Sequence, residues 1–234
     1  MFMASPCIRG VIFDMDGVLC DSEPFICEAA CKMFQRVHGV VVKPEDFKPF
    51  VGTGEDRFIG GVAEKYSITN RDAVAEKAAT YEIYLEIIKG RLQPLAGVVN
   101  FIKHVRGRGI KTAVASSADL VKVQGNLAQI GLTPEASFDV VVCGEDVQRK
   151  KPAPDIFLLA AKRLGLSNDE CIVVEDAPSG VQAAKGAGSR CLGIISSFDE
   201  QTLRHAGADW ISRDLQDAAK IFQLSPSLSP EHVL

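Results

Sequence analysis

From about residue 94 onward the sequence alternates between short apolar runs, typical of buried strands, and longer segments with helical periodicity. Counting one run near the start, six apolar runs are predicted to be strands, at 8–13, 111–115, 138–143, 171–174, 190–194 and 209–212. Helices are predicted before and between the later strands, at 98–106, 120–130, 154–164 and 180–186. Strands that are covered on both faces and joined by helices form mostly parallel sheets with helices on either side. The sequence therefore predicts an α/β fold of the Rossmann-like, doubly wound type.

Residues 22–94 interrupt this alternation, because they carry helical signals and no convincing strand. The predicted helices of this segment lie at 23–37, 56–66 and 71–88. We expect a small α-helical cap domain at 22–94, inserted into an α/β core domain made of 1–21 and 95–224. The last segment, 225–234, is rich in Ser and Pro and is expected to be a disordered tail.

The composition is that of an ordinary soluble globular protein, with 47% apolar residues, 24% charged residues and a net charge of −4. This balance gives no reason to expect a nucleic-acid or membrane partner. No apolar run approaches the roughly 20 residues of a membrane span, and the first residues lack the build of a secretory signal. The seven cysteines contain no Cys-x-x-Cys pair, which argues against a disulfide framework and a zinc site. We expect a cytoplasmic protein of open oligomeric state, for which a monomer is plausible.

Two carboxylates follow the first predicted strand. Asp14 and Asp16 lie two residues apart, and Gly17 after them allows the backbone to turn sharply. Both side chains can then reach one point at the carboxyl end of the strand, where doubly wound sheets bind their ligands. The alternative at this stage is a solvated Asp-rich turn.

The later predicted strands also end in polar residues. The strand 111–115 runs into Ser116 and Ser117, whose hydroxyl and backbone N–H groups suit a phosphate oxygen. Lys151 lies beside a proline before the helix 154–164 and offers a point charge for a phosphate.

A second pair of carboxylates, Glu175 and Asp176, ends the strand 171–174. With Asp14 and Asp16 they would place four carboxylates at one sheet edge, and these would repel strongly unless a cation lay among them. Oxygen ligands without nearby His or Cys favour a hard divalent ion, so Mg²⁺ is the expected cofactor.

These motifs, in this order, resemble those of the haloacid dehalogenase superfamily phosphohydrolases with a helical cap after the first strand. The resemblance extends from about residue 8 to about residue 222. It is carried by Asp14-Met15-Asp16-Gly17-Val18, by Ser116, by Lys151 in Lys-Pro-Ala-Pro-Asp, and by Glu175-Asp176 before Ala-Pro-Ser-Gly. The family is one of enzymes, and the resemblance implies a phosphoric monoester hydrolase that acts on a small phosphorylated metabolite.

The resemblance also implies roles for the first motif. Asp14 would be the nucleophile that forms an aspartyl-phosphate. Asp16 would protonate the leaving oxygen and then activate the water that hydrolyses the intermediate.

The other motifs would hold the phosphoryl group and the metal. Ser116, with Ser117 beside it, and Lys151 would bind the transferring phosphoryl group. Asp14, the backbone carbonyl of Asp16 and Asp176 would hold Mg²⁺. Glu175 would be a ligand through water or would orient the other ligands.

Within the superfamily the chain resembles β-phosphoglucomutases and the related sugar-phosphate and nucleotide phosphatases. It departs from the mutases in the cap, where Ile26 stands in place of a histidine and the acidic Glu55 at about the place of an arginine. Ala118 and Asp119 replace the Ser and Lys that follow the second motif of the mutases. A mutase must hold both phosphates of a bisphosphate, so simple hydrolysis is favoured and a mutase remains the alternative.

The cap segment 50–58 also resembles the phosphatase-like region of plant suppressor-of-quenching proteins. We expect this loop to contribute to selection of the leaving group through Gly52, Thr53, Gly54, Glu55 and Arg57. Two readings from other classes stay open at this stage, namely a receiver domain that signals through a phosphoaspartate and a catalytically idle interaction module.

Overall fold

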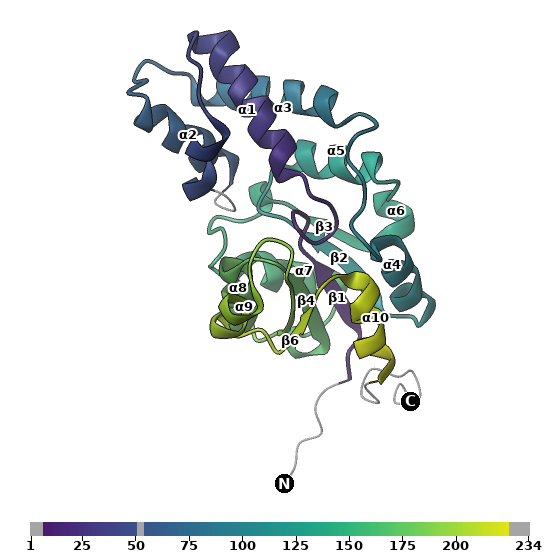
Figure 1. Ribbon diagram of the computed structural model, residues 1–234. Coiled ribbons are helices and arrows are strands. Elements are labelled where there is room, and N and C mark those ends of the chain that lie inside the picture. Colours follow the sequence, from purple (N-terminus) through teal and green to yellow (C-terminus); the bar gives the residue numbers. More distant parts are fainter. Residues whose placement is uncertain (1–6, 51–53, 225–234) are drawn as a thin grey trace.

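A six-stranded sheet forms the centre of the molecule in the computed structural model, which describes residues 7–50 and 54–224 (Figure 1). The strands are β1 (Gly10–Phe13), β2 (Lys111–Ala115), β3 (Val140–Val142), β4 (Cys171–Glu175), β5 (Arg190–Ile194) and β6 (Trp210–Ser212). Every neighbouring pair is parallel, in the order β3-β2-β1-β4-β5-β6. This is the doubly wound order, so the predicted fold class is confirmed.

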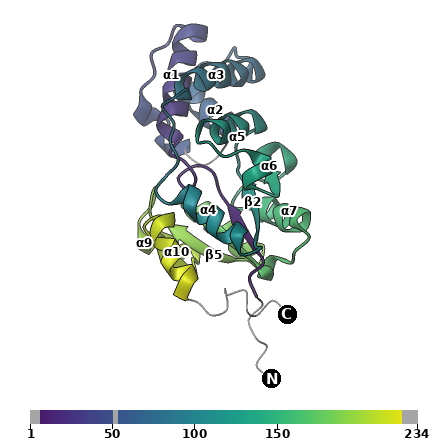
Figure 2. The same ribbon diagram turned by 90° about the vertical axis from the view of Figure 1, so that its right-hand side faces the viewer.

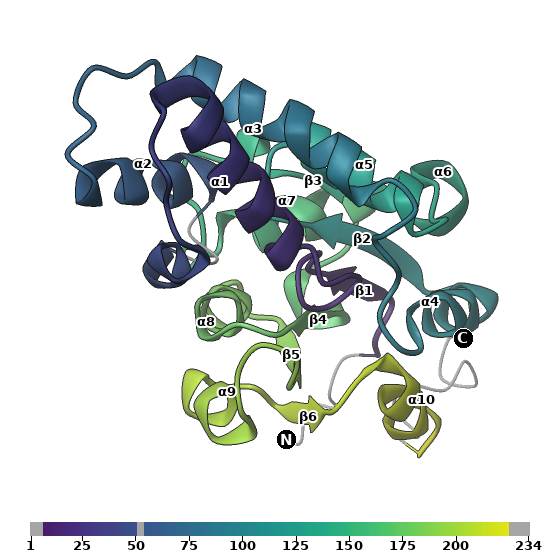
Figure 3. The same ribbon diagram turned by 45° about the horizontal axis from the view of Figure 1, so that its top comes forward.

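Helices cover both faces of the sheet because the strands are apolar on both sides. Val11 and Phe13 of β1 point into one core cluster and Ile12 points into the other. On the first face lie α4 (Val98–Gly107) and α10 (Leu215–Leu224), and on the second lie α7 (Asp155–Leu164), α8 (Pro178–Gly186) and α9 (Glu200–Ala206), as Figure 3 shows. Short helical turns complete the chain at Pro134–Ser137 (α6), Pro44–Asp46, Lys48–Phe50, Gly144–Asp146 and Asn168–Glu170.

Strand β1 is the point at which the strand order reverses. Its Phe13 lies opposite Val114 of β2 on one side and Val174 of β4 on the other. The residues that follow these three strands therefore emerge side by side. In open α/β sheets a crevice at this reversal point is where ligands bind.

Three helices of the 22–94 segment lie beyond the carboxyl edge of the sheet (Figure 1). They are α1 (Glu23–His38), α2 (Glu55–Lys65) and α3 (Ala73–Ile88). An aromatic cluster joins α1 to α2, since the ring centroid of Phe47 lies 6.2 Å from that of Phe34 of α1 and 4.7 Å from that of Phe58 of α2. The division into a core domain and a cap domain stays a prediction.

Helix α5 (Leu120–Gln129) lies between α3 and the sheet (Figure 2). Gly125 of α5 faces Leu85 of α3 closely, because a Cβ at this position would lie 2.3 Å from Leu85 Cδ2. The buried Tyr84 hydroxyl of α3 donates a hydrogen bond to Asn126 Oδ1 of α5. Helix α3 therefore packs against α5.

Two adjacent segments of the chain connect the sheet with the helices of the 22–94 segment. The Leu95 N–H donates to Leu19 O at 3.0 Å, and Cys20 forms an isolated bridge with Pro94. The two crossings are thus joined by backbone hydrogen bonding.

Besides the one-turn α6, two helices were missed by the sequence analysis. In α9 only Leu203 is buried, so the segment lacks an apolar stripe from which a helix could be predicted. Helix α10 directly follows the edge strand β6 and was likewise not predicted.

Two simpler expectations can be compared with the structure. All seven cysteines, each among the described residues, are free thiols. Among the described helices none is long and apolar enough to cross a membrane. The predicted tail 225–234 lies outside the described residues.

Candidate active site

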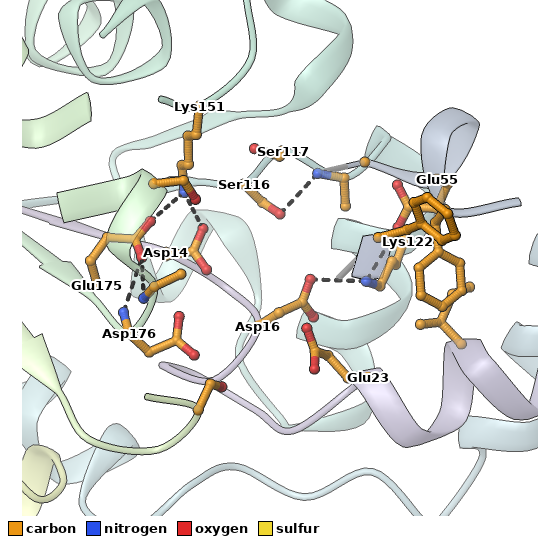
Figure 4. Close-up of a pocket in the computed structure, with 18 of the residues that line it drawn as sticks. Asp14, Asp16, Glu23, Glu55, Ser116, Ser117, Lys122, Lys151, Glu175 and Asp176 are labelled. Carbon is orange, nitrogen blue, oxygen red and sulfur yellow. Dashed lines mark hydrogen bonds and ion pairs between the residues drawn. The ribbon is translucent and has the colours of Figure 1, made fainter. Parts of the chain in front are cut away.

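Three carboxylates and one lysine meet at the carboxyl ends of β1 and β4. Carboxylate oxygens of Asp14, Glu175 and Asp176 all lie within 4.8 Å of one another, and all three residues are buried. Lys151 Nζ donates to Asp14 Oδ1, to Glu175 Oε1 at 2.6 Å and to Ala115 O at 3.2 Å (Figure 4). The predicted motifs that follow β1, precede α7 and end β4 are therefore brought together.

Two glycines make room for these carboxylates. Gly17 has φ 76°, and a Cβ there would lie 1.9 Å from Asp176 Oδ2. A Cβ at Gly180, near the start of α8, would lie 1.8 Å from Glu175 Oε1. Any larger residue at these positions would displace a carboxylate, which gives a physical reason for both glycines.

Glu175 is held by the backbone as well as by Lys151. Its Oε2 accepts from the N–H groups of Asp176 at 3.0 Å and Ala177 at 3.1 Å. Both carboxylate oxygens are thus engaged, and this arrangement favours an orienting residue over a direct metal ligand.

The three-carboxylate cluster is short of positive charge. Burial, together with the charges of Glu175 and Asp16, raises the pKa of Asp14 to about 7, although Lys151 opposes the rise. Burial, Glu175 and Asp14 raise the pKa of Asp176 well above its ordinary value. Burial by itself lowers the pKa of Lys151, but Asp14 and Glu175 outweigh it and the net shift is upward. The buried oxygen ligands and the excess of negative charge both fit a divalent cation such as Mg²⁺.

Ser116 and Ser117 follow β2 beside this cluster. Ser116 is 2% exposed, and its Oγ accepts from the Ala118 N–H at 3.2 Å. Its own N–H donates to Val142 O at 3.1 Å, so this N–H is not available to a phosphate as the sequence analysis expected. The Ser117 Oγ is buried and has no hydrogen-bond partner within the described part of the chain. Both serines line the cavity described next.

The site opens into a cavity of about 310 Å³. The predicted site residues that line it are Asp14, Asp16, Gly54, Glu55, Ser116, Ser117, Lys151, Glu175 and Asp176. Arg57 is not among the lining residues, because its guanidinium bonds Glu64 at 2.9 Å and lies over the ring of Phe50. Gly52 and Thr53 lie outside the described residues.

A second charged cluster lies across the cavity, with Asp16 between it and Lys151 (Figure 4). Asp16 accepts from the Ser22 hydroxyl and, at 2.9 Å, from Lys122 Nζ. Lys122 also forms an ion pair with Glu55 Oε1 at 3.3 Å. Glu23 lines the same region, and its pKa is raised to about 7 by burial and by the charge of Asp16.

Lys122 and Glu23 were missed by the sequence analysis. Lys122 and Asn126 are both buried and lie four residues apart on α5, beside the apolar stripe of Val123 and Leu127. Two polar residues at this spacing mark one helix face, and they were the available signal. Nothing in the spacing indicated that this face meets Asp16.

A doubly wound sheet with carboxylates, a serine and a lysine gathered at its strand ends defines a class of proteins built for phosphoryl transfer. Residues 8–188 match the family model described as haloacid dehalogenase-like hydrolase. The chain therefore belongs to this family.

Individual proteins show the same relationship. The chain is 42% identical over 210 residues to the chloroplastic protein SUPPRESSOR OF QUENCHING 1 of Arabidopsis thaliana, a match that covers 89% of this chain and 20% of that protein. It thus spans about a fifth of the length of this relative. It is 35% identical over 207 residues to the phosphorylated carbohydrates phosphatase of Thermotoga maritima, covering 86% and 92% of the two chains.

A solved structure gives the same result. The crystal structure of CbbY from Rhodobacter sphaeroides in complex with phosphate superimposes with a TM-score of 0.78 at 26% identity, covering 89% of this chain and 95% of the other. The predicted family, and the predicted enzyme class of a phosphoric monoester hydrolase of the haloacid dehalogenase type, are confirmed. The receiver-domain reading is set aside.

Proposed function

We propose that this protein is an Mg²⁺-dependent phosphatase that hydrolyses a small phosphorylated metabolite through an aspartyl-phosphate on Asp14. The observation that carries the proposal is the contact of Asp14 with Lys151 beside Glu175 and Asp176, at the strand end that faces the cavity. Positioning and charge neutralisation supply most of the rate in phosphoryl transfer, and this cluster provides both.

In the first step a carboxylate oxygen of Asp14 attacks phosphorus. The attack requires the ionised carboxylate, and Lys151 favours this form although burial opposes it. Lys151 also provides a positive charge for the phosphoryl oxygens as they move from the leaving group to Asp14. The Ser117 hydroxyl, which is buried without a partner among the described residues, would donate to one of these oxygens, with Ser116 beside it.

Mg²⁺ would be held by Asp14, by Asp176 and by the backbone carbonyl of Asp16. When bound, the ion would neutralise negative charge on the carboxylates and on the phosphoryl group. Glu175 would keep Lys151 and the Asp176 backbone in place.

Asp16 would move the proton. Its carboxyl group faces the cavity and would protonate the leaving oxygen when the P–O bond breaks. The resulting carboxylate would then take a proton from the water that attacks the aspartyl-phosphate. Its bonds to Ser22 and Lys122 fix the position of this carboxylate.

The substrate class we propose is a sugar phosphate or nucleotide, with the leaving group recognised in part by Gly54 and Glu55. The name of the Thermotoga maritima relative supports the carbohydrate side of this class. The roles of Gly52, Thr53 and Arg57 in selection stay predictions. Ile26, which stands where the mutases carry a histidine, lines the cavity and can neither carry a charge nor move a proton, so this position favours hydrolysis over the mutase alternative.

The test is a phosphate-release screen over sugar phosphates, polyol phosphates, nucleotides and an aryl phosphate, with and without Mg²⁺. We expect release from several of these esters that is lost when the metal is chelated. Absence of Mg²⁺-dependent release from the whole panel, with folded protein, would contradict the proposed function and favour the idle interaction module.

A further inference from the structure

Lys122 places a buried ammonium group in the cavity wall, at the end away from Lys151. Its side chain is 4% exposed and lines the cavity. Burial by itself lowers the pKa of Lys122, but the charges of Asp16 and Glu55 outweigh it and the net shift is upward, so the group stays charged. A buried ion pair is often no more stabilising than apolar side chains of the same size. Stability of the fold therefore does not by itself account for a lysine here.

Asp16 is held at both of its carboxylate oxygens. The Ser22 hydroxyl donates to Oδ1, and Lys122 Nζ donates to Oδ2 at 2.9 Å (Figure 4). Each carboxylate oxygen can accept more than one hydrogen bond, so these contacts leave lone pairs for a leaving oxygen or a water. The two donors thus fix the rotation of the carboxyl group without blocking it.

Lys122 is itself held in place. Its Nζ also pairs with Glu55 Oε1 at 3.3 Å and lies 6.0 Å from the ring centroid of Tyr84. The Tyr84 hydroxyl in turn donates to Asn126, one turn after Lys122 on α5. A group fixed in this way can hold Asp16 in one orientation, and small displacements of an acid or base cost large factors in rate.

We propose that Lys122 is a positioning residue that orients the Asp16 carboxyl group for both of its proton transfers. In the first, the Asp16 proton goes to the leaving oxygen as that oxygen takes the electron pair of the P–O bond. In the second, Asp16 takes a proton from the water whose oxygen attacks phosphorus, and the bond from phosphorus to Asp14 breaks. Lys122 keeps its own protons throughout and acts through Asp16. This inference rests on the proposed function and gives α5, which none of the sequence motifs marked, a part in proton transfer.

Two aryl phosphates that differ in their need for a proton test the inference. 2,4-Dinitrophenyl phosphate releases a stable anion, whereas phenyl phosphate releases a strongly basic oxygen that requires protonation. Because kcat/KM covers the steps up to departure of the leaving group, the ratio of kcat/KM for phenyl over dinitrophenyl phosphate reports the first proton transfer.

Lys122→Met is expected to lower this ratio by about 10-fold or more. A merely structural role would lower kcat/KM for both esters alike and leave the ratio unchanged. An unchanged ratio in the folded variant would overturn the inference. A higher ratio would also overturn it, because Lys122 would then hold Asp16 away from the leaving oxygen.

A double variant shows whether Lys122 acts through Asp16. Asp16→Asn removes the proton donor and should lower the ratio further than Lys122→Met does. Adding Lys122→Met to Asp16→Asn should then change the ratio by less than about 3-fold. If the full effect of Lys122→Met persisted without the Asp16 carboxyl group, Lys122 would act on the leaving group directly, against the inference.

Lys77→Met is the matched control. Lys77 of α3 pairs at 2.8 Å with Asp119, which precedes the first residue of α5, so its loss disturbs the same helix without removing a contact to Asp16. We expect the wild-type ratio. A fall as large as in Lys122→Met would show that the ratio reports the packing of α5, and this result would overturn the inference.

A second background covers the case in which Lys122→Met does not fold, as judged by circular dichroism. Glu55→Gln removes the other carboxylate that Lys122 compensates, so Lys122→Met leaves one buried charge fewer without a partner in this background. The ratio should fall by about 10-fold or more from Glu55→Gln to Glu55→Gln/Lys122→Met. An equal ratio in these two proteins would overturn the inference.

A failure of this inference differs from a failure of the proposed function. Mg²⁺-dependent hydrolysis of dinitrophenyl phosphate by the wild-type protein establishes the phosphatase without any proton from Asp16. If that activity is present and Lys122→Met keeps the wild-type ratio, the positioning role is wrong while the phosphatase stands. If the wild-type protein lacks that activity, both are wrong.

Discussion

Glu175 shows how tightly single residues are constrained around the nucleophile. Its carboxylate accepts from Lys151 and from two backbone N–H groups, and Gly180 leaves it just enough space. The position of Lys151 against Asp14 thus depends on a residue that need not touch the substrate.

The first prediction concerns Gly180→Ala. The added Cβ would lie 1.8 Å from Glu175 Oε1, so the carboxylate or α8 must move. We expect a loss of about 2–3 kcal/mol in the free energy of unfolding and a fall of about 10-fold or more in kcat/KM. Urea unfolding and phosphate release measure the two effects.

Gly107→Ala is the matched control, because a Cβ at this helical position meets no atom of the described residues within 4 Å outside its own stretch of helix. We expect it to be neutral or to stabilise by up to about 1 kcal/mol. If Gly180→Ala behaved in the same way, the close fit around Glu175 would be wrong.

The second prediction concerns pH and metal. In the metal-free fold the pKa of Asp14 is about 7 against an ordinary value of 3.8, so the folded state holds a proton that the unfolded state has released. The stability from this proton is fully present below about pH 4 and is lost as the pH rises through 7. Mg²⁺ binds the ionised carboxylate, so the rise in Tm on adding Mg²⁺ should be larger at pH 8 than at pH 6.

Thermal unfolding with and without Mg²⁺ at these two pH values measures the difference. Asp176→Asn, which removes a proposed ligand, should lose most of the rise at pH 8. A rise that is larger at pH 6, or that survives in Asp176→Asn, would contradict the metal assignment.

At the scale of elements, α2, α3 and α5 are joined by a charged contact. Lys77 of α3 pairs with Asp56 of α2 at 3.0 Å and with Asp119, at the start of α5, at 2.8 Å. The Asp119 side chain is only 9% exposed, so it depends on this lysine for charge compensation.

The third prediction follows from this contact. Lys77→Met should destabilise the protein by about 1–2 kcal/mol, because it leaves Asp119 largely buried without its partner. Lys89→Met is the control, since Lys89 follows the last residue of the same helix and, among the described residues, pairs only with the exposed Glu86. It should change stability by less than about 0.5 kcal/mol. Urea unfolding measures both changes. Equal losses in the free energy of unfolding for the two variants would contradict a stabilising role of the Lys77 contact.

The strands and most of the helices could be predicted because their patterns are local. Strand β1 is apolar on both faces, which marks it as central, and the polar residues after β1, β2 and β4 follow directly from the strand ends. Lys122 and Glu55 could not be paired in this way. They lie far apart in the sequence on α5 and α2, and only the packing of these helices brings them together.

At the scale of the whole molecule, the cavity is lined from two directions. The strand ends provide Asp14, Ser116 and Asp176, whereas α1 and α2 provide Glu23 and Glu55. The chemistry and the choice of leaving group are thus placed on different parts of the chain. The adjacent crossings at Leu19 and Leu95 are the links through which those parts are joined.

The central claim is that Asp14 is the nucleophile, and Asp14→Asn tests it most directly. Phosphate release from the best ester of the screen should be measured for the wild-type protein and this variant, with and without Mg²⁺, after circular dichroism has shown that both are folded. The account predicts Mg²⁺-dependent release by the wild-type protein and a loss on the order of 10³-fold or more in the variant. Turnover by folded Asp14→Asn within about 10-fold of the wild-type rate would contradict the account.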